Sequence, residues 1–363
     1  MRREPLTDPA CPATRPATRP AGARAAAGAQ PPRIGYLPWT GVTNPYTERF
    51  IEILGAFGPV AALPTPRELL RHPWRLRRRF DVALVNWIEH ELVRRRDGAF
   101  SVAGLARVLV RVLLLRCVAR RVVYVRHNNF PHGTRAADRE RAQRTLDRLE
   151  RLFDAVLIHA GHAPAPHRRY VPHPLYHLAS AAPDAAESRL LAALPARFYA
   201  VFGRIARYKG IDRLLAHFPP ERELVVLGAV EEPAYLATLQ GMAGPNVHIL
   251  AGQVSDALAQ AVLRRSCGLV LSHAERDMIV SGSLFYALSL GTRVFAIDSP
   301  ALAWLRTRIG AAELQLAPDV AALCGLIARG RDAPGGAPAC PAHIADEFGD
   351  TRIAGVLREV LFP

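Results

Sequence analysis

The chain has 363 residues, of which 50% are apolar, and it carries a formal net charge of +15 at pH 7. This length suits two ordinary domains, and the apolar content is sufficient for two cores. The five cysteines show no CxxC pair and no His/Cys ligand spacing, and their odd number argues against a secreted disulfide framework. We therefore expect a reduced, cytoplasmic protein with no metal ion and no resident cofactor.

Residues 1–32 differ in composition from the rest of the chain. Pro-Ala-Thr-Arg occurs twice between positions 12 and 19, an alanine-rich stretch follows, and no apolar core of a signal peptide is visible. This low-complexity composition predicts a disordered basic tail.

Four short apolar runs in the first half of the chain are each followed by a loop and a helical pattern. This alternation is typical of a parallel sheet covered on both faces, and it predicts an N-terminal Rossmann-like domain over residues 33–175. The predicted strands are Ile34 to Leu37, Val82 to Asn86, Val122 to Arg126 and Ala155 to His159.

Positive charge is concentrated between Arg67 and Arg126, where the chain has 15 arginines and only five acidic residues. Such a patch suits nucleic acid, an anionic membrane or an acidic polysaccharide, with bulk solubility as the alternative. Within it, Leu105 to Arg121 is apolar but interrupted by arginines, so no uncharged run approaches the roughly 20 residues that a spanning helix needs. We expect either a mostly buried helix with snorkelling arginines or a peripheral membrane contact.

A second alternating series predicts a C-terminal Rossmann-like domain over residues 197–340, after a proline-containing linker at 176–196 and before a C-terminal helix at 341–363. Its predicted strands are Phe198 to Phe202, Leu224 to Leu227, Val247 to Leu250, Leu269 to Leu271 and Val294 to Ile297. Two doubly wound domains imply a cleft, and ligands of open α/β sheets bind beyond the carboxyl ends of the strands.

Polar and aromatic side chains follow three strands of the first predicted sheet, where such a ligand would bind. They are Asn44 and Tyr46 after the first strand, Trp87 and Glu89 after another, and His127 and Asn128 after a third. Their common placement predicts a site in the cleft. The alternatives are that His127 caps a loop and that Glu89 pairs with neighbouring arginines at the surface.

Lys209 is the only lysine among the 47 basic residues of the chain. It closes a segment, Gly203 to Lys209, that leads from a predicted strand through a glycine turn into a helix, which is a natural anion site. Arginine adds a planar fork for phosphate oxygens and lysine adds a compact charge. We therefore predict that Gly203, Arg204 and Lys209 bind a diphosphate on a solvent-facing turn. The alternative is an ordinary solvated lysine.

A second small-residue segment, Ser281, Gly282 and Ser283, opens a predicted helix that closes at Gly291. Free N–H groups at a helix start bind phosphate, so this segment is predicted to be the other half of a diphosphate clamp. An ordinary helix cap is the alternative.

Together these segments resemble the GT-B glycosyltransferases, in particular the nucleotide-sugar group with a Gly-Arg…Lys-Gly segment, and within it the xanthan-type side-chain β-mannosyltransferases. The resemblance covers roughly residues 33 to 300. It is carried by Thr43-Asn44-Pro45-Tyr46, the Asp81 to Glu89 stretch with Trp87, Arg126-His127-Asn128 with Pro131-His132, Phe202-Gly203-Arg204 with Tyr208-Lys209-Gly210, and Ser281-Gly282 with Ala287-Leu288-Ser289-Leu290.

The chain departs from the general family at one pair of positions. The general family carries two glutamates eight residues apart, of which the second holds the nucleotide ribose. The resemblance aligns them with Met278 and Tyr286, and neither of these side chains is a carboxylate. Glu275 and Asp277 lie nearby in sequence and are candidates to substitute. We therefore predict that Tyr286 and Glu275 contact the nucleotide.

The resemblance implies transfer of a sugar, best matched by mannose from GDP-mannose, onto a lipid-linked oligosaccharide in exopolysaccharide biosynthesis. No Asp-x-Asp occurs, which fits a metal-independent transferase whose own cations stabilise the leaving diphosphate. Glu89 is the first candidate for the base and His127 the second. The predicted acceptor-binding residues are Asn44, Tyr46, Trp87 and Asn128.

The same resemblance and the basic patch predict peripheral attachment to the inner face of the cell membrane, and no nucleic-acid partner. Two other functions stay open. A nucleotide-sugar 2-epimerase has the same architecture, and a basic nucleic-acid-binding protein would explain the charge, although no aromatic-rich strand or helix-turn-helix spacing supports it.

Overall fold

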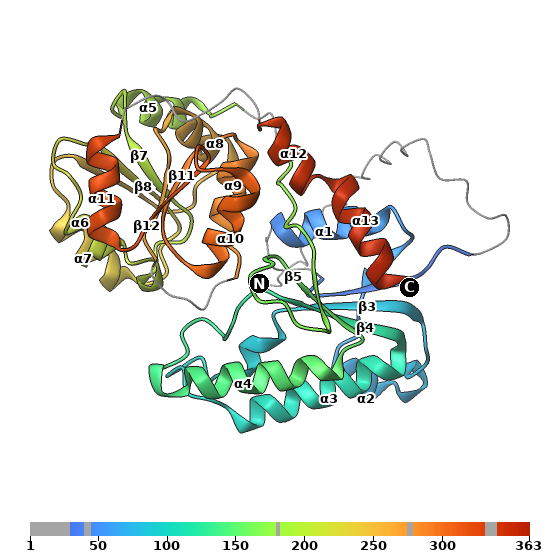
Figure 1. Ribbon diagram of the computed structural model, residues 1–363. Helices are drawn as coiled ribbons and strands as arrows, with labels where there is room; N and C mark the ends of the chain where they lie inside the picture. Colours follow the sequence, from blue (N-terminus) through green and yellow to red (C-terminus); the bar gives the residue numbers. More distant parts are fainter. Residues whose placement is uncertain (1–29, 40–44, 179–181, 274–278, 331–339) are drawn as a thin grey trace, which may run out of the picture. The chain divides into compact units, whose positions relative to one another are not determined.

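The computed structural model describes residues 30–39, 45–178, 182–273, 279–330 and 340–363, and Pro32–Pro363 forms one compact unit. In this unit two six-stranded sheets carry helices on their faces, and the described strands pair in parallel throughout (Figure 1). The predicted class, α/β with two doubly wound parallel sheets, is confirmed. The predicted tail at residues 1–32 lies almost wholly outside the described residues.

The first sheet has the strand order β2-β1-β3-β4-β5-β6. Its strands are β1 (Ile34–Leu37), β2 (Val60–Ala62), β3 (Phe80–Asn86), β4 (Ala119–Arg126), β5 (Ala155–Ile158) and β6 (Arg168–Tyr170). The four predicted strands are present. The edge strands β2 and β6 were not predicted, because their sequences, VAA and RRY, are not runs of large apolar residues and neither strand is buried.

Helices cover both faces of the first sheet (Figure 1). On one face, α2, α3 and α4 enclose a core with the sheet, and on the other face lie α1 and the C-terminal α13. The helices of this half are α1 (Pro45–Gly55), α2 (Pro66–Arg71), α3 (Val102–Val118) and α4 (Arg139–Leu149), with short 3-10 helices at Pro73–Arg75, Ile88–Leu92, Ala136–Asp138 and Glu150–Leu152.

Helix α3 corrects the expectation of a mostly buried helix over Leu105 to Arg121. It ends at Val118, and the following residues begin β4. One face of α3, including Val108 and Val112, packs on the sheet, whereas the opposite apolar face is exposed. No helix among the described residues is long and apolar enough to cross a membrane.

The second sheet has the strand order β12-β11-β10-β7-β8-β9. Its strands are β7 (Tyr199–Phe202), β8 (Leu224–Gly228), β9 (Val247–Ala251), β10 (Leu269–Leu271), β11 (Val294–Ile297) and β12 (Leu314–Ala317). The helices of this half are α5 (Ala185–Ala193), α6 (Ile211–Leu215), α7 (Pro233–Met242), α8 (Asp256–Arg265), α9 (Gly282–Ser289), α10 (Pro300–Ile309) and α11 (Val320–Arg329), with a 3-10 helix at Arg207–Lys209. Of these strands, only β12 was not predicted, and α5 occupies part of the segment expected to be a linker.

Each sheet reverses its winding direction at one point, and ligands of such sheets bind at the carboxyl ends of the strands there. In the first sheet this point lies between β1 and β3, and in the second between β7 and β10. The polar residues that the sequence singled out follow β3, β4 and β7, close to these two points.

The C-terminal segment forms two helices, α12 (Ala342–Phe348) and α13 (Asp350–Leu361), where one was predicted. The extended backbone of Gly349 separates them. Helix α13 packs against α1, and Asp350 forms an ion pair of 2.5 Å with the buried Arg49. The end of the chain therefore belongs structurally to the first sheet.

Candidate functional site

The two predicted halves of the diphosphate clamp meet at one backbone carbonyl. Lys209 Nζ donates a hydrogen bond of 2.9 Å to the Phe202 oxygen at the end of β7. Ser283 Oγ, in the first turn of α9, donates a bond of 3.0 Å to the same oxygen. Phe202 and Ser283 are 81 positions apart in the sequence, and they lie side by side at the point where the second sheet reverses its winding direction.

Gly203 is required by this arrangement. Its backbone has φ +99°, a conformation that side chains other than hydrogen rarely allow. A Cβ at this position would lie 2.9 Å from Lys209 Nζ and 2.9 Å from Ser283 Oγ. The backbone N–H of Gly203 donates to Leu227 O at 3.1 Å, so it is not the phosphate donor that the sequence suggested.

Lys209 is buried, with only 8% of its surface exposed, and this corrects the expectation of a solvent-facing lysine. Ser272 Oγ, just beyond β10, holds the Lys209 backbone oxygen at 2.7 Å. No carboxylate of the described residues pairs with its ammonium group. Burial, and then the nearby charge of Arg204, lower the pKa of Lys209 from 10.5 to about 8.

Arg204 is exposed, as predicted for a residue on the turn after β7. Its guanidinium is 3.8 Å from a carboxylate oxygen of Glu231, too far for a hydrogen bond. The neighbouring Arg207 donates to Glu232 at 2.9 Å and lies over the ring of Tyr235. Arg204 is therefore the less restrained of the two cations that flank this turn.

The start of α9 offers further donors. Ser281 is the residue before the first turn, and its side chain makes no capping hydrogen bond. Gly282 is exposed and Ser283 is half-buried. Because the first N–H groups of a helix have no partner within the helix, this end of α9 can donate to an anion beside Lys209.

In the first half, His127 follows β4 and is buried. Its Nε2 lies 3.0 Å from Asn86 Oδ1, while Asn86 Nδ2 donates to Leu37 O at 3.1 Å. The amide orientation makes Asn86 Oδ1 an acceptor, so His127 carries its proton on Nε2 and its lone pair on Nδ1. Burial, then the neighbouring His159 and His173, hold the pKa of His127 well below 6.5.

Trp87 packs on the His127 ring, with centroids 4.5 Å apart and planes 20° from parallel. It is also the one described residue other than glycine with a positive φ, at 53°. This left-handed backbone turns the chain sharply at the end of β3 and sets the indole against the imidazole. Local backbone strain of this kind is most often found at functional sites.

Glu89 does not face a cleft, which corrects the sequence prediction. The residue is fully buried, and its carboxylate accepts from Tyr124 Oη at 2.7 Å and from Asn128 Nδ2 at 3.3 Å. Both of its carboxylate oxygens are thus bonded within the fold, so Glu89 is not placed to act as the base, and it is no surface partner of arginine either. Its contacts place it beneath the loop that carries His127, where it orients the amide of Asn128.

Tyr46 extends the same buried group of rings. Its hydroxyl lies 2.9 Å from His159 Nε2, and its ring contacts that of His127 edge-on with centroids 4.8 Å apart. His173 in turn stacks on Phe285 of α9 at 4.2 Å. The sequence did not single out His159 and His173, because His159 was the last residue of a predicted strand and His173 lies between two prolines.

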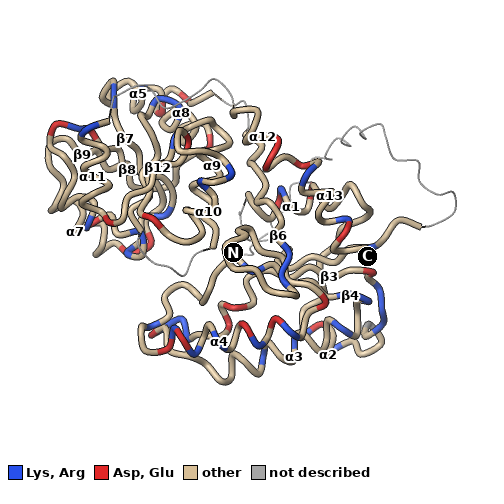
Figure 2. Tube along the Cα trace, viewed as in Figure 1, with Lys and Arg blue, Asp and Glu red and all other residues tan. Residues whose placement is uncertain are grey.

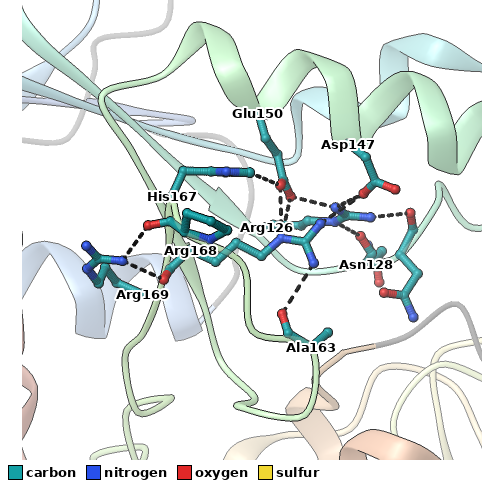
Figure 3. Close-up of polar contacts among 10 residues, drawn as sticks. Arg126, Asn128, Asp147, Glu150, Ala163, His167, Arg168 and Arg169 are labelled. Carbon is teal, nitrogen blue, oxygen red and sulfur yellow. Dashed lines mark hydrogen bonds and ion pairs between the residues drawn. The ribbon is translucent and has the colours of Figure 1, made fainter.

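Arg126 anchors the loop that follows β4 (Figure 3). Its guanidinium donates to Asn128 O at 2.9 Å and to Asn129 O at 2.7 Å, and it pairs with Glu150 at 2.5 Å and with Asp147 at 2.6 Å. Both Arg126 and Glu150 are buried.

Two residues near β6 complete this cluster (Figure 3). Arg168 pairs with Glu150 and Asp147, each at 2.9 Å, and His167 Nε2 lies 2.7 Å from Glu150. The network fixes the backbone directly after His127. No local signal distinguishes Glu150 from the other charged residues of its segment, so the sequence could not identify it.

Tyr286 follows Ser283 by one turn of α9 and packs against Phe202, with ring centroids 4.9 Å apart. Its hydroxyl donates to Asp256 Oδ1 at 3.4 Å. Tyr286, Asp256 and Gln260 line a cavity of about 180 Å³. A carboxylate supplied by α8 thus lies beside Tyr286.

Several predicted residues lie outside the described part of the chain. They are Asn44, Glu275, Asp277 and Met278. Among the described residues, no group of three or more His, Cys, Asp or Glu side chains is placed to hold a metal ion.

Comparison with solved structures identifies the architecture as the GT-B fold. Sucrose-phosphate synthase from Thermosynechococcus elongatus matches with a TM-score of 0.56 at 17% identity, covering 83% of this chain and 81% of that one. AviGT4, a glycosyltransferase involved in avilamycin A biosynthesis, matches with a TM-score of 0.52 at 15% identity, covering 91% and 97%.

A third similar structure is an α,α-trehalose-phosphate synthase (UDP-forming) from Burkholderia xenovorans in complex with glucose-6-phosphate. Its TM-score is 0.52 at 15% identity, and the match covers 81% of this chain and 74% of that one. No protein-family model and no curated protein sequence matches the chain. The predicted GT-B fold is confirmed, whereas the resemblance to xanthan-type mannosyltransferases stays a prediction.

Proposed function

We propose that this protein is a glycosyltransferase that takes a sugar from a nucleoside-diphosphate donor. The observation that carries the proposal is Lys209, a buried ammonium group that no carboxylate of the described residues neutralises. An unpaired buried charge is costly, and a diphosphate at this position would supply the missing negative charge. All three similar structures named above are glycosyltransferases of the same fold.

The chemistry follows from the donor. When the sugar leaves, negative charge develops on the diphosphate oxygens, and preorganised cations and N–H groups stabilise it most strongly in a site shielded from water. Lys209, Arg204 and the first turn of α9 would supply these groups. Each charge-assisted contact contributes about 1.5–3 kcal/mol. The proposal needs no metal ion, because the side chains carry the compensating charge.

The nucleoside would occupy the cavity beside Tyr286. Ser283 and Tyr286 lie one turn apart on α9, so a donor whose diphosphate reaches Lys209 can place its ribose against Tyr286. Asp256 accepts a hydrogen bond from the Tyr286 hydroxyl, and it is the carboxylate available to bind the ribose hydroxyls in place of the expected glutamate. The contact that we propose between Glu275 and the nucleotide rests on the sequence alone.

The acceptor would bind at the carboxyl ends of β3 and β4, with Tyr46, Trp87, Asn128 and, from the sequence, Asn44. His127 is the proposed base in place of Glu89. Because its pKa lies well below 6.5, His127 is unprotonated at neutral pH, and Nδ1 can accept a hydrogen bond from an acceptor hydroxyl.

The finer assignment rests on the resemblance in sequence. We propose mannose from GDP-mannose as the donor, and a lipid-linked oligosaccharide of exopolysaccharide biosynthesis as the acceptor. An enzyme with such an acceptor works at the inner face of the cell membrane, to which it would attach peripherally.

A panel of GDP-, UDP- and ADP-sugars tests the donor, with thermal unfolding as the readout. A donor at 100 times its Kd stabilises the fold by about 2.7 kcal/mol. Arg204→Ala should weaken this donor at least about tenfold, because a charge-assisted contact of ~1.5 kcal/mol is lost. Arg207→Ala is the matched control, since that neighbouring guanidinium is already bonded to Glu232.

Two results would contradict the proposal. One is the absence of stabilisation by every donor, and the other is an equal loss of affinity in Arg204→Ala and Arg207→Ala. Product analysis then separates the two enzyme classes. A glycosyltransferase releases nucleoside diphosphate only as sugar is transferred to an acceptor or to water, whereas a 2-epimerase returns an altered nucleotide sugar.

A further inference from the structure

Helix α3 presents two apolar faces, of which only one is buried. Val108, Val112 and Leu115 pack on the first sheet. On the opposite face Val102, Leu109, Val110 and Leu113 are exposed, with Leu113 at 64%. At 100° per residue these four positions fall on one stripe along the helix.

The neighbouring segment adds two exposed apolar side chains. Helix α2 contacts α3, and Leu70 on α2 and Trp74 just after it are exposed by 71% and 65%. Monomeric soluble proteins seldom expose a contiguous apolar surface of several large side chains without a binding role. We call the surface formed by Leu70, Trp74, Val102, Leu109, Val110 and Leu113 the α2–α3 face.

Basic residues lie along α3 and in the segment that follows α2 (Figure 2). Arg107 and Arg116 flank the stripe on α3, and the exposed Arg77 and Arg78 follow Trp74. Arg107 pairs with Glu91 and Arg116 donates to Leu152 O at 2.7 Å, so both are already engaged within the fold. Helix α3 itself contains no acidic residue. Among the described contacts, the nearby Glu91 is held by Arg107 and Arg111, so it adds little free negative charge.

We infer that the α2–α3 face is a membrane-docking surface that inserts its apolar stripe into the interface of an anionic bilayer. An in-plane helix binds this way when large apolar residues point into the acyl boundary and arginines beside them reach the headgroups. Charge complementarity favours this occupant, since each basic residue near an anionic leaflet adds to binding. A protein partner would have to neutralise the same arginines with its own acidic groups.

This inference rests on the proposed function in one respect: a lipid-linked acceptor at the membrane surface is the reason why the enzyme would dock there. It names the surface, the residues and the mode of contact, which net charge alone does not do. Binding through this face combines an apolar contribution that survives salt with an electrostatic one that salt screens.

The test measures binding of the full-length protein to vesicles of phosphatidylcholine with 30 mol% phosphatidylglycerol, at about 50 mM and about 1 M salt, where the Debye length differs several-fold. The double variant Leu109→Ser, Leu113→Ser should lower the partition coefficient about tenfold or more, because two apolar side chains no longer insert. The matched control is Leu190→Ser on α5, which is 45% exposed but far from this face in sequence. Every protein compared carries the same N-terminal segment, so its contribution cancels.

The variant Arg77→Gln, Arg78→Gln should weaken binding roughly tenfold at low salt and little at high salt, since it removes only screened contacts. Quenching of tryptophan fluorescence by brominated lipid should fall in Trp74→Phe. Equal binding by the wild type and the double leucine variant would overturn the inference. The inference would also be overturned if the wild type did not bind vesicles but formed a dimer, and the double leucine variant stayed monomeric. The α2–α3 face would then bind a second copy of the protein.

Donor stabilisation serves as an independent readout on the same variants. The double leucine variant should keep the wild-type response to a nucleotide sugar, because no leucine of the α2–α3 face contacts Lys209 or Ser283 in the described contacts. A failure of vesicle binding with intact donor binding would overturn the docking surface alone. A failure of donor binding with intact vesicle binding would overturn the proposed function alone.

Discussion

Replacing Lys209 by methionine should stabilise the fold while it removes donor binding. The ammonium group is buried, and among the described residues it has no carboxylate partner, so its charge is held in the native state at a cost. Methionine has a similar length and no charge. The Phe202 oxygen keeps its bond from Ser283 Oγ in the variant, so no buried carbonyl loses its last partner.

The magnitude follows from the pKa. The decrease of the Lys209 pKa from 10.5 to about 8 corresponds to about 3 kcal/mol of destabilisation by the buried charge at neutral pH. Loss of the hydrogen bond to Phe202 O offsets about 1 kcal/mol of this. The free energy of unfolding of Lys209→Met at pH 7 should therefore be about 2 kcal/mol higher than that of the wild type, so the variant is the more stable protein.

The gain depends on pH in a defined direction. Below pH 8 the lysine is protonated in both the native and the unfolded state, so the full cost of the buried charge is present. Between pH 8 and 10.5 the unfolded state binds more protons than the native state, and the stability of the wild type rises with pH. The advantage of Lys209→Met should consequently shrink to below about 1 kcal/mol near pH 10.

Urea unfolding of both proteins at pH 7 and pH 10 measures these free energies, with Arg207→Met as the control for an exposed cation of the same turn. The reasoning is refuted if Lys209→Met is less stable than the wild type at pH 7, or if its advantage does not change with pH. Either outcome would mean that the Lys209 charge is neutralised or solvated. Donor binding by the same variant should be lost, as judged by thermal shift.

Three further predictions address the same site. Gly203→Ala should destabilise the protein by about 1–3 kcal/mol in urea unfolding, because it combines a positive φ with a Cβ 2.9 Å from Lys209 Nζ, and it should weaken donor binding more than any change confined to the loop surface. Donor affinity, followed by calorimetry, should decrease above pH 8 by up to about tenfold per pH unit as Lys209 loses its proton, and a flat profile from pH 7 to 9.5 would exclude it from the diphosphate site. Glu150→Gln should cost about 3–5 kcal/mol, since it leaves buried Arg126 short of a counter-charge, and an unchanged urea midpoint would contradict the network drawn in Figure 3.

The fold was predictable because its signals are local. Strands such as β1, β10 and β11 are short apolar runs, and a run of this kind is buried on both faces wherever a parallel sheet is covered by helices. The glycine turn after β7 and the small residues opening α9 are also local patterns. They located Gly203, Lys209 and Ser283, which the structure brings together.

Burial was not predictable, because it depends on segments that are distant in the sequence. Glu89 follows a strand end, where a carboxylate was expected to face a ligand. Instead it is buried, and it accepts a hydrogen bond from the Tyr124 hydroxyl of β4. Lys209 was expected in solvent, but it is buried and bonds the same Phe202 oxygen as Ser283 of α9, a helix that begins 73 residues further along the chain at Gly282.

Apolar periodicity and turn residues act over a few positions, so the two doubly wound sheets and the places where their loops carry charge could be predicted from local pattern. Long-range packing, in contrast, places Asp256 beside Tyr286, lets Arg126 and Glu150 hold the loop after β4, and leaves the second apolar face of α3 uncovered. Each of these depends on which helices and strands pack against one another. An apolar stripe looks the same in sequence whether or not the fold covers it.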